Sequence, residues 1–394
     1  MKTSHRRQRS MIRPGSVLRL AAAGVAVRRI ARAARTVPPV RATVRSSAEI
    51  SAAGVSGGIT VVVPARDEVG RLVPLLEAVV GAPGVSEVIV VDDGSTDGTA
   101  ELARDAGARV IIGEELPGGW AGKAWALQQG IGEATTEWVV TLDADTRPSA
   151  ELPGALVARA MGDGLGFLTV AGRFECPTAA LRWLHPAMLT TLVYRFGPPG
   201  ADPPPAAHRS MANGQCMTLR REPFLDAGGL GPVAGQPVED VALARHLAAA
   251  GWSIAFLDAS ELLCVRMYEG FADAWRGWGR SLALPGVEPT WRQVLDLGVV
   301  VLAQGLPLVR LLARRADALD LLLLVVRFGT LVGTAGSYVG TPSTRRPGPA
   351  YWLSPLADLP AAVALAGGII RRRQTWRGRE YVTPAVPPAR TAAR

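Results

Sequence analysis

Acidic residues follow apolar runs at two places early in the chain, where they could bind a nucleotide. The first group lies in Pro64–Glu68 and the second in Asp92–Thr99. Carboxylates at the ends of neighbouring strands can accept hydrogen bonds from a base N–H and from ribose hydroxyls. The tetrapeptide Asp-Asp-Gly-Ser alone is typical of an ordinary turn with a helix cap. The complete string VVDDGSTDGT after an apolar strand is a far more specific signal.

A third acidic group, Asp143 and Asp145, has the spacing of a pair that could hold a divalent cation. Mg²⁺ and Mn²⁺ take oxygen ligands and usually keep phosphate and water in their coordination shell. A lone Asp-x-Asp is weak evidence, but this one directly follows the apolar run Trp138–Leu142. That position strengthens the interpretation as a metal site that a diphosphate ligand would complete.

Lys123 lies in the string GWAGKAWAL, where glycines precede a predicted helix. A helix N-terminus with a lysine could face phosphates. The spacing is not that of a P-loop. A glycine-punctuated helix start with a solvated lysine is an equally good interpretation.

Two further groups have both a structural and a catalytic interpretation. Glu239 and Asp240 open a predicted helix, where acidic residues favour the first turn, but a catalytic carboxylate is the sharper hypothesis. Arg276, Trp278 and Arg280 precede an apolar region. They could form a belt at a membrane interface, or close over a diphosphate through bidentate arginine contacts.

Alternating strands and helices must position these residues. Strands are predicted at 59–63, 88–91, 110–112 and 138–142, and helices at 71–80, 99–106 and 238–250, while residues 179–196 are interpreted as an amphipathic segment. Strands that are continuous apolar runs and alternate with helices indicate a parallel α/β sheet. Ligands bind beyond the carboxyl ends of the strands in such sheets, where the first three acidic groups fall.

Composition excludes several classes of protein. Of the 394 residues, 48 % are hydrophobic and 20 % are charged, which disfavours a disordered chain and a coiled coil. The net charge of +9 comes from basic residues gathered in 1–50 and 371–394, while the chain between them is net acidic. This favours an anionic membrane surface over nucleic acid as a partner. Three cysteines without CxxC spacing predict neither a disulfide framework nor a zinc site, and fit a reducing compartment.

Three apolar stretches near the C-terminus, 294–313, 319–340 and 350–370, are each about long enough to span a membrane, although each contains charges. We favour an interfacial 294–313 and a membrane hairpin of the other two, which leaves Arg314, Arg315 and the basic tail on the inner side. Buried helices of a soluble protein are the alternative.

These changes in charge and hydropathy along the chain divide it into four predicted regions. They are a basic N-terminal tail that is interfacial or disordered (1–57), a catalytic domain (58–285), a membrane-associated helical region (286–373) and a basic C-terminal tail (374–394).

Taken in order, seven strings resemble family 2 glycosyltransferases of the GT-A fold, over residues 58–282 and the membrane tail. They are VVVPARDE, VVDDGSTDGT, GWAGKAWAL, DADTRP, NGQCMTLRREPF, VEDVALARHL and RMYEGFADAWRGWGRSL. The last string and the terminal TWRGR are most similar to the membrane-associated branch linked to hopanoid and carotenoid glycosylation. The resemblance implies an α/β GT-A fold with a Rossmann-like mixed sheet and C-terminal membrane helices.

The resemblance also implies a role for each site residue. The nucleotide-sugar site would consist of Pro64, Arg66, Glu68, Asp93, Lys123 and Asp143. Asp145 would hold Mg²⁺ or Mn²⁺. Asp240 would be the general base, with Glu239 beside it near the acceptor. Arg276, Trp278 and Arg280 fall where the family carries Gln-x-x-Arg-Trp, in a changed order, and would act on the diphosphate or as a gate.

The implied reaction is inverting transfer of a sugar, expected to be glucose, from a UDP-sugar to a carotenoid, hopanoid or polyprenyl-like lipid. The expected location is the cell membrane, with the catalytic domain facing the cytoplasm and no nucleic acid as partner. The alternatives are a UDP-sugar-binding membrane protein without catalysis or with another acceptor, and a nucleotidyltransferase on a related fold.

Overall fold

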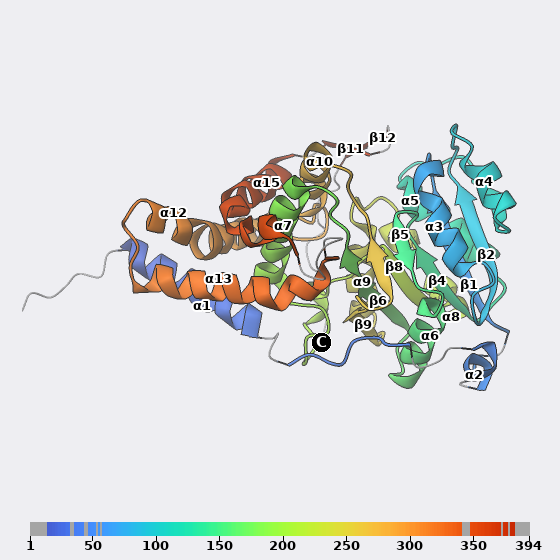
Figure 1. Cartoon of the computed structure of the whole chain (residues 1–394). Helices are drawn as coiled ribbons and strands as arrows, with labels where there is room; N and C mark the ends of the chain where they lie inside the picture. Colours follow the sequence, from blue (N-terminus) through green and yellow to red (C-terminus); the bar gives the residue numbers. More distant parts are fainter. Residues whose placement is uncertain are drawn as a thin grey trace, which may run out of the picture.

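The structure is a computed structural model, and it describes residues 14–31, 35–42, 46–52, 54–55, 57–340, 347–371, 373–376 and 379–382. A seven-stranded mixed sheet lies at one end of the molecule, and a body of helices lies at the other (Figure 1). In spatial order the strands of the sheet are β3 (Arg109–Ile112), β2 (Val85–Asp92), β1 (Ile59–Ala65), β4 (Trp138–Leu142), β8 (Cys216–Arg220), β6 (Phe167–Ala171) and β9 (Ile254–Asp258).

Strand β8 makes the sheet mixed, because it runs antiparallel to both of its neighbours, β4 and β6. The strands from β3 to β4 pair in parallel, as the apolar runs predict. The mixed sheet that the resemblance implies is therefore confirmed, while a wholly parallel sheet is wrong for the second half of the domain. Residues 146–148, 263–265 and 173–174 form a smaller sheet in the order β5 (Thr146–Pro148), β10 (Leu263–Val265) and β7 (Arg173–Phe174).

Helices cover both faces of the large sheet. They are α3 (Val69–Val79), α4 (Thr99–Asp105), α5 (Gly122–Glu133), α6 (Leu152–Gly162), α8 (Arg221–Asp226) and α9 (Glu239–Ala249). Successive side chains of a strand point to opposite faces. Val61 and Val63 accordingly pack in one core with α3 and α6, whereas Val62 packs in a second core with α5 and α9. The short helix α2 (Ser47–Ala52) adds Ile50 to the first core.

The helical body is built from segments far apart in the sequence. It contains α1 (Pro14–Ile30), α7 (Ala179–Phe196), α10 (Phe271–Ser281), α11 (Thr290–Val299), α12 (Leu306–Leu312), α13 (Ala318–Thr334), α14 (Pro349–Trp352) and α15 (Asp358–Ile370). A π-helical turn joins α11 to α12 as one continuous helix. The hairpin of β11 (Arg373–Trp376) and β12 (Arg379–Val382) follows α15.

The N-terminal helix α1 belongs to this body. Its alanines pack with Tyr194, Val299 and Leu323, and Arg19 forms an ion pair of 2.5 Å with Asp320. This part of the predicted basic tail is therefore helical. Residues 1–13 of that tail, and 383–394 of the C-terminal tail, lie outside the described part of the chain.

Two helices in the described part of the chain are long and apolar enough to cross a membrane, Thr290–Leu312 and Ala318–Ser337. The third predicted stretch is interrupted near Leu353, and its longest apolar helical piece, Ser354–Ile370, is shorter. The predicted membrane hairpin of 319–340 with 350–370 stays a prediction, and the two stretches are in contact through the ion pair of Arg327 with Asp358. Helix α13 also packs against the α11–α12 helix.

Each charge within these apolar stretches has an oppositely charged partner. Arg327 and Asp358 lie 2.9 Å apart, and both are 1 % exposed. Asp320 pairs with Arg310 as well as Arg19, and Asp296 pairs with Arg29 at 2.8 Å. Pairing offsets much of the cost of removing charges from water.

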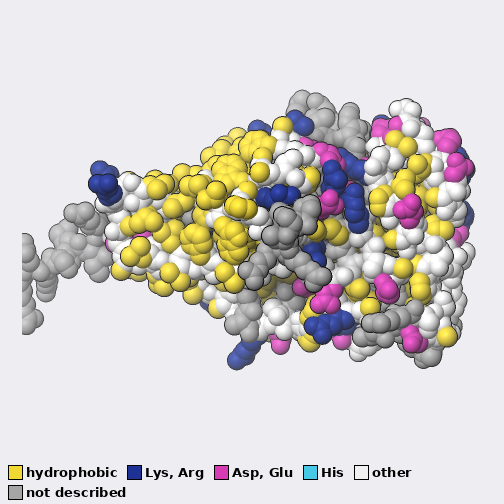
Figure 2. Space-filling model, in the orientation of Figure 1, with side chains coloured by type: hydrophobic (Ala, Val, Ile, Leu, Met, Phe, Trp, Pro, Cys, Tyr) yellow, Lys and Arg dark blue, Asp and Glu magenta, His cyan; other side chains and the backbone are white. Residues whose placement is uncertain are grey.

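Large apolar side chains nevertheless remain exposed on α1, α12 and α13. Leu18, Leu312 and Val325 are each more than 60 % exposed. Figure 2 shows hydrophobic side chains gathered over the end of the molecule that holds these helices, away from the sheet. An apolar surface of this extent is typical of contact with a membrane or a partner.

Candidate functional site

A cavity of about 1180 Å³ opens at the carboxyl ends of β1, β2 and β4 and continues into the helical body. It gathers most of the residues that the sequence singles out. Those that line it are Pro64, Arg66, Glu68, Asp93, Lys123, Asp143, Asp145, Glu239, Asp240, Trp278 and Arg280. Arg276 is not among the lining residues and lies on the exposed side of α10. The topology thus brings the acidic groups together as predicted.

The loops after β1 and β2 hold each other in place at one end of the cavity. A guanidinium nitrogen of Arg66 donates to the backbone carbonyl of Asp93 at 2.9 Å and lies 3.7 Å from its carboxylate. The backbone N–H of Glu68 donates to Oγ1 of Thr99 at 2.9 Å. Asp67 between them has a left-handed backbone with φ 52°, and its carboxylate accepts from the N–H of Thr96. These hydrogen bonds between the two loops fix polar groups around one end of the cavity.

Lys123 connects the acidic residues after β4 with those at the start of α9. Its Nζ lies 2.8 Å from Oδ2 of Asp143 and 3.2 Å from Oε1 of Glu239, and donates to the carbonyl of Gly214 at 3.2 Å. Burial alone would lower the pKa of Lys123, but the charges of Asp143 and Glu239 outweigh it and raise the pKa above its usual value. Lys123 is thus a paired charge inside the site rather than a solvated lysine.

The Asp-x-Asp pair follows β4 directly. The backbone N–H of Asp143 donates to the carbonyl of Gln215, and Oγ1 of Thr146 donates to the carbonyl of Asp143 at 2.7 Å. Asp145 has a buried oxygen, Oδ1, without a hydrogen-bond partner among the described residues. Burial and the neighbouring Asp143 raise the pKa of Asp145 to about 7. An ionised Asp145 therefore needs a positive group to stabilise it.

Asp240 lies in the first turn of α9, where two backbone amides bind its carboxylate. Oδ2 accepts from the N–H of Gly214 at 2.6 Å, and Oδ1 accepts from the N–H of Val241 at 2.8 Å. Burial and the adjacent Glu239 raise the pKa of Asp240 to about 6. Asp240 therefore binds a backbone amide in the first turn of α9 and also presents a carboxylate of raised pKa to the cavity. Its interpretation as a helix-capping residue is thus compatible with its interpretation as a catalytic carboxylate.

Gly214 is a site residue that the sequence analysis did not single out. A Cβ at this position would lie 3.0 Å from Cβ of Asp240 and 3.1 Å from Nζ of Lys123. A side chain would thus crowd both charged groups. The signal was present in the string NGQC immediately before β8, but Asn-Gly alone predicts only a turn.

Helix α10 brings two of its three predicted residues to the cavity. Trp278 is 5 % exposed, and its Nε1 has no hydrogen-bond partner among the described residues. Arg280, two residues further along α10, also lines the cavity. Gly277 allows close packing here, since a Cβ would lie 2.4 Å from the ring of Tyr268.

The far half of the cavity is bounded by the helical body. Helix α7 contributes Leu189, Leu192 and Phe196, and α13 contributes small residues such as Gly329 and Gly333. One cavity therefore has a wall of charged side chains at the sheet and a largely apolar wall between helices.

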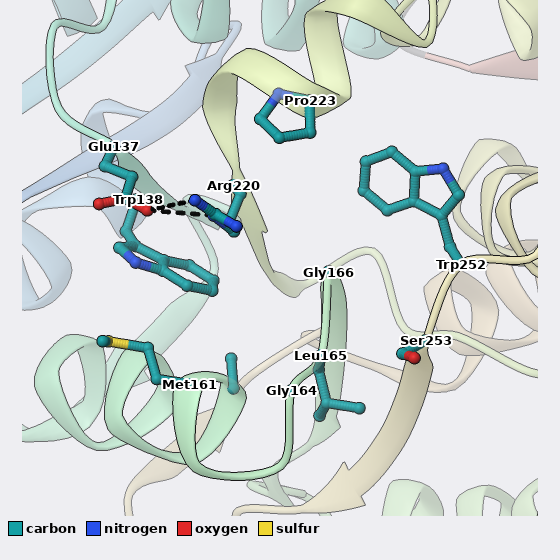
Figure 3. Close-up of a pocket in the computed structure, with 11 residues that line it drawn as sticks. Glu137, Trp138, Met161, Gly164, Leu165, Gly166, Arg220, Pro223, Trp252 and Ser253 are labelled. Carbon is teal, nitrogen blue, oxygen red and sulfur yellow. Dashed lines mark hydrogen bonds and ion pairs between the residues drawn. The ribbon is translucent and has the colours of Figure 1, made fainter.

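A second hollow, of about 490 Å³, lies at the amino end of β4 and contains none of the predicted site residues. Figure 3 shows the indoles of Trp138 and Trp252 at its sides, with an ion pair between Arg220 and Glu137 at 2.8 Å. Because the acidic residues Asp93, Asp143 and Asp145 follow the opposite ends of the strands, this hollow is separate from the larger cavity.

Comparison with protein families identifies one match. Residues 60–226 match the family model described as glycosyl transferase family 2. The match includes the strings around Asp93, Lys123 and Asp143 and ends before Glu239 and Asp240.

Among curated proteins, the chain is similar to 4,4'-diaponeurosporenoate glycosyltransferase of Staphylococcus aureus, with 40 % identity over 88 residues. The match covers 22 % of this chain and 24 % of the relative, so it spans about a quarter of that protein.

Among solved structures, a glucosyl-3-phosphoglycerate synthase from Mycobacterium tuberculosis, in complex with Mn²⁺, UDP and glucosyl-3-phosphoglycerate, is 21 % identical with a TM-score of 0.42. The similarity covers 61 % of this chain and 82 % of that one. A structure described as a mycobacterial protein is 23 % identical, with a TM-score of 0.42, over 61 % of this chain and 77 % of that one.

Proposed function

We propose, from the match of residues 60–226 to glycosyl transferase family 2, that the chain transfers a sugar from a UDP-sugar to an apolar lipid. The sugar we propose is glucose. The acceptor we propose is a carotenoid, hopanoid or polyprenyl-like alcohol or acid. The observation that carries this proposal is the single cavity that joins the carboxylates of the sheet to an apolar wall between helices.

The donor nucleotide is proposed to bind beyond β1 and β2. Pro64, Arg66, Glu68 and Asp93 line this end of the cavity and would hold the uridine. The hydrogen bond from Arg66 to the carbonyl of Asp93 supports this assignment, because it fixes both loops before the ligand arrives. Lys123 and Asp143 would face the sugar and diphosphate.

A divalent cation, Mg²⁺ or Mn²⁺, fits beside Asp145. The fit rests on the buried Oδ1, which has no partner among the described residues, and on the carboxylate chemistry that such cations prefer. The described residues contain no group of three or more His, Cys, Asp or Glu that could hold a metal. The diphosphate and water would therefore supply the remaining ligands. When bound, the cation would neutralise charge on the departing diphosphate.

Asp240 is proposed to take the proton from the acceptor hydroxyl. The freed oxygen forms a bond to the anomeric carbon as the bond from that carbon to the UDP oxygen breaks, so the configuration is inverted and the proton stays on Asp240. The backbone amides of Gly214 and Val241 orient the carboxylate for this step. An ion pair of 3.2 Å with Lys123 holds Glu239 next to Asp240.

The cell membrane is the proposed location, with the catalytic domain on the cytoplasmic side. Support for the membrane comes from the two apolar helices and from the exposed leucines and valines around them. Support for the cytoplasmic side comes from the cysteines Cys176, Cys216 and Cys264, which are free thiols in the catalytic domain.

Measurement of UDP release tests this proposal. The detergent-solubilised full chain is incubated with UDP-glucose, UDP-galactose or UDP-N-acetylglucosamine, with Mg²⁺ or Mn²⁺, and with or without a total lipid extract. We expect metal-dependent release from UDP-glucose that increases with lipid. Pyrophosphate formed from UTP and a sugar phosphate would indicate a nucleotidyltransferase instead. Donor binding without release would indicate a protein that binds without catalysis.

A further inference from the structure

We propose that the arm of the cavity between α7 and α13 is the binding site for the hydrocarbon chain of the acceptor. We also propose that a row of small residues on α13 determines how bulky that chain can be. The chemical class is a linear or methyl-branched hydrocarbon that ends in a hydroxyl or carboxyl group. This inference rests on the proposed glycosyltransferase function and assigns the acceptor to specific residues.

One face of α13 forms the wall of this arm. Its six lining residues recur at intervals of three and four, as residues on one helix face do. They are Val326, Gly329, Thr330, Gly333 and Thr334 of α13 and Ser337 of the 3-10 turn that continues it. From Val326 to Thr334 the α-helix rises about 12 Å, so the wall is long enough to follow part of an extended hydrocarbon chain.

The arm opens at the glycines of this face. A Cβ built at Gly329 or Gly333 meets no atom within 4 Å. Both glycines are exposed although they line the cavity. The space beside them is thus continuous with the outside of the molecule.

The opening of the arm lies among the exposed apolar side chains of the helical body. Val325, Phe328 and Val332 flank the glycines on α13 and are 68 %, 46 % and 66 % exposed. This is the part of the molecule where hydrophobic side chains gather in Figure 2. An acceptor dissolved in the bilayer would therefore enter sideways between helices, without its chain passing through water.

The opposite wall of the arm is apolar. Leu189, Leu192 and Val193 of α7 line it, and Phe196 continues the wall toward α9. These side chains offer dispersion contacts and no hydrogen bonds, which suits a hydrocarbon and disfavours a sugar or peptide acceptor.

Trp278 places a polar group beside this otherwise apolar part of the cavity. Its indole lines the cavity and is 5 % exposed, yet its Nε1 has no hydrogen-bond partner among the described residues. A buried donor without a partner is costly, and native structures rarely leave one unsatisfied. A shift of the indole that exposes Nε1 would let it donate to the hydroxyl or carboxyl end of the acceptor.

Binding of cis-parinaric acid, a linear fluorescent polyene acid, tests the proposal on the full chain in detergent. Gly333→Leu fills the arm at its opening. Gly298→Leu is the matched control, because Gly298 also lies within an apolar helix, meets no atom within 4 Å of a built Cβ and does not line the cavity. Gly329→Leu provides a second blocking variant, and thermal unfolding shows whether each variant has folded.

We expect saturable binding to the wild type and to Gly298→Leu, and at least tenfold weaker binding to Gly333→Leu or Gly329→Leu. Equal affinity in all folded variants, or only non-saturable partition into detergent, would overturn the assignment. UDP release by the wild type is measured on the same samples. Its absence would count against the proposed transferase, whereas the binding series alone decides the acceptor arm.

Discussion

The backbone N–H of Gly214 donates a hydrogen bond of 2.6 Å to Oδ2 of Asp240, while the carbonyl of the same residue accepts from Lys123 at 3.2 Å. Gly214 thus positions both the proposed base, Asp240, and Lys123, which pairs with Glu239. Gly214 lies just before β8, so the antiparallel strand in the middle of the sheet carries this contact to the site.

Replacement of Gly214 by alanine is expected to lower the turnover number by about tenfold or more. The added Cβ would lie 3.0 Å from Asp240 and 3.1 Å from Nζ of Lys123, so one of these charged groups must move. A displacement of this size within a catalytic constellation is costly. Steady-state kinetics of UDP release measure the effect.

Gly132→Ala is the matched control, since Gly132 is an exposed helix residue whose built Cβ meets nothing within 4 Å. Normal turnover by Gly214→Ala would show that the contact does not position the base. A shifted pH dependence in this variant would separate a change at Asp240 from a general loss of folded protein.

Replacement of Asp240 by asparagine should leave UDP binding largely intact and lower transfer by about 10²- to 10⁴-fold, the usual range for loss of a general base. The amide keeps the size of the side chain but cannot take a proton from the acceptor. Calorimetric binding of UDP and measured transfer are compared in wild type and variant. The exposed Asp226→Asn in α8 serves as a control, and near-normal turnover by Asp240→Asn would remove the assignment.

Transfer should decline as the pH falls through about 6. Burial and Glu239 raise the pKa of Asp240 to about 6. Below that pH most Asp240 is protonated and cannot act as a base. Lys123 opposes the shift, and Glu239 and Lys123 are the charged groups that face this carboxylate. The rate at saturating donor, acceptor and metal is measured from pH 4.5 to 8.

The binding of UDP over the same pH range separates this effect from Asp145, whose pKa is raised to about 7. A rate that stays flat down to pH 4.5 would show that no such carboxylate limits the reaction.

Replacement of Asp145 by asparagine should abolish the dependence of UDP binding on Mg²⁺ or Mn²⁺. Loss of the charge removes the carboxylate oxygen that is buried without a partner among the described residues. Calorimetry of UDP with and without each cation measures the change. An unchanged response to metal would place the cation elsewhere.

Replacement of Arg327 by methionine is expected to destabilise the helical body by roughly 3–5 kcal/mol, since the buried Asp358 would lose its charged partner. Asp358 also accepts from Gln304 at 2.9 Å, which does not replace the lost charge. The double variant Arg327→Met with Asp358→Leu should recover most of the loss. Denaturation in detergent measures both, and a double variant as unstable as the single one would contradict this explanation.

Much of the catalytic half could be predicted from the sequence, because its signals are local. The run Trp138–Leu142 is β4 as predicted, and the segment 179–196, interpreted as amphipathic, forms α7. Acidic residues at the ends of β1, β2 and β4 meet because parallel strands end at one edge of a sheet. The same logic places Lys123 near Asp143.

The remaining features depend on contacts between distant segments. The strand β8 has no local feature that makes it antiparallel, and Gly214 acts only because α9 brings Asp240 to it. The charges within the apolar stretches could not be matched in advance, because partners such as Arg19 and Asp320 are separated by most of the chain. Arg276 was grouped with Trp278 by sequence proximity, but helical geometry turns the two to different faces of α10.

Transfer of labelled sugar into an organic phase tests the central claim most directly. The solubilised full chain is incubated with UDP-[¹⁴C]glucose, Mn²⁺ and a total lipid extract, and label in the chloroform phase is compared for wild type and Asp240→Asn. The account predicts label that depends on time, metal and lipid in the wild type and that is nearly absent in the variant. Label confined to the aqueous phase in the wild type, or equal lipid labelling by both proteins, would contradict it.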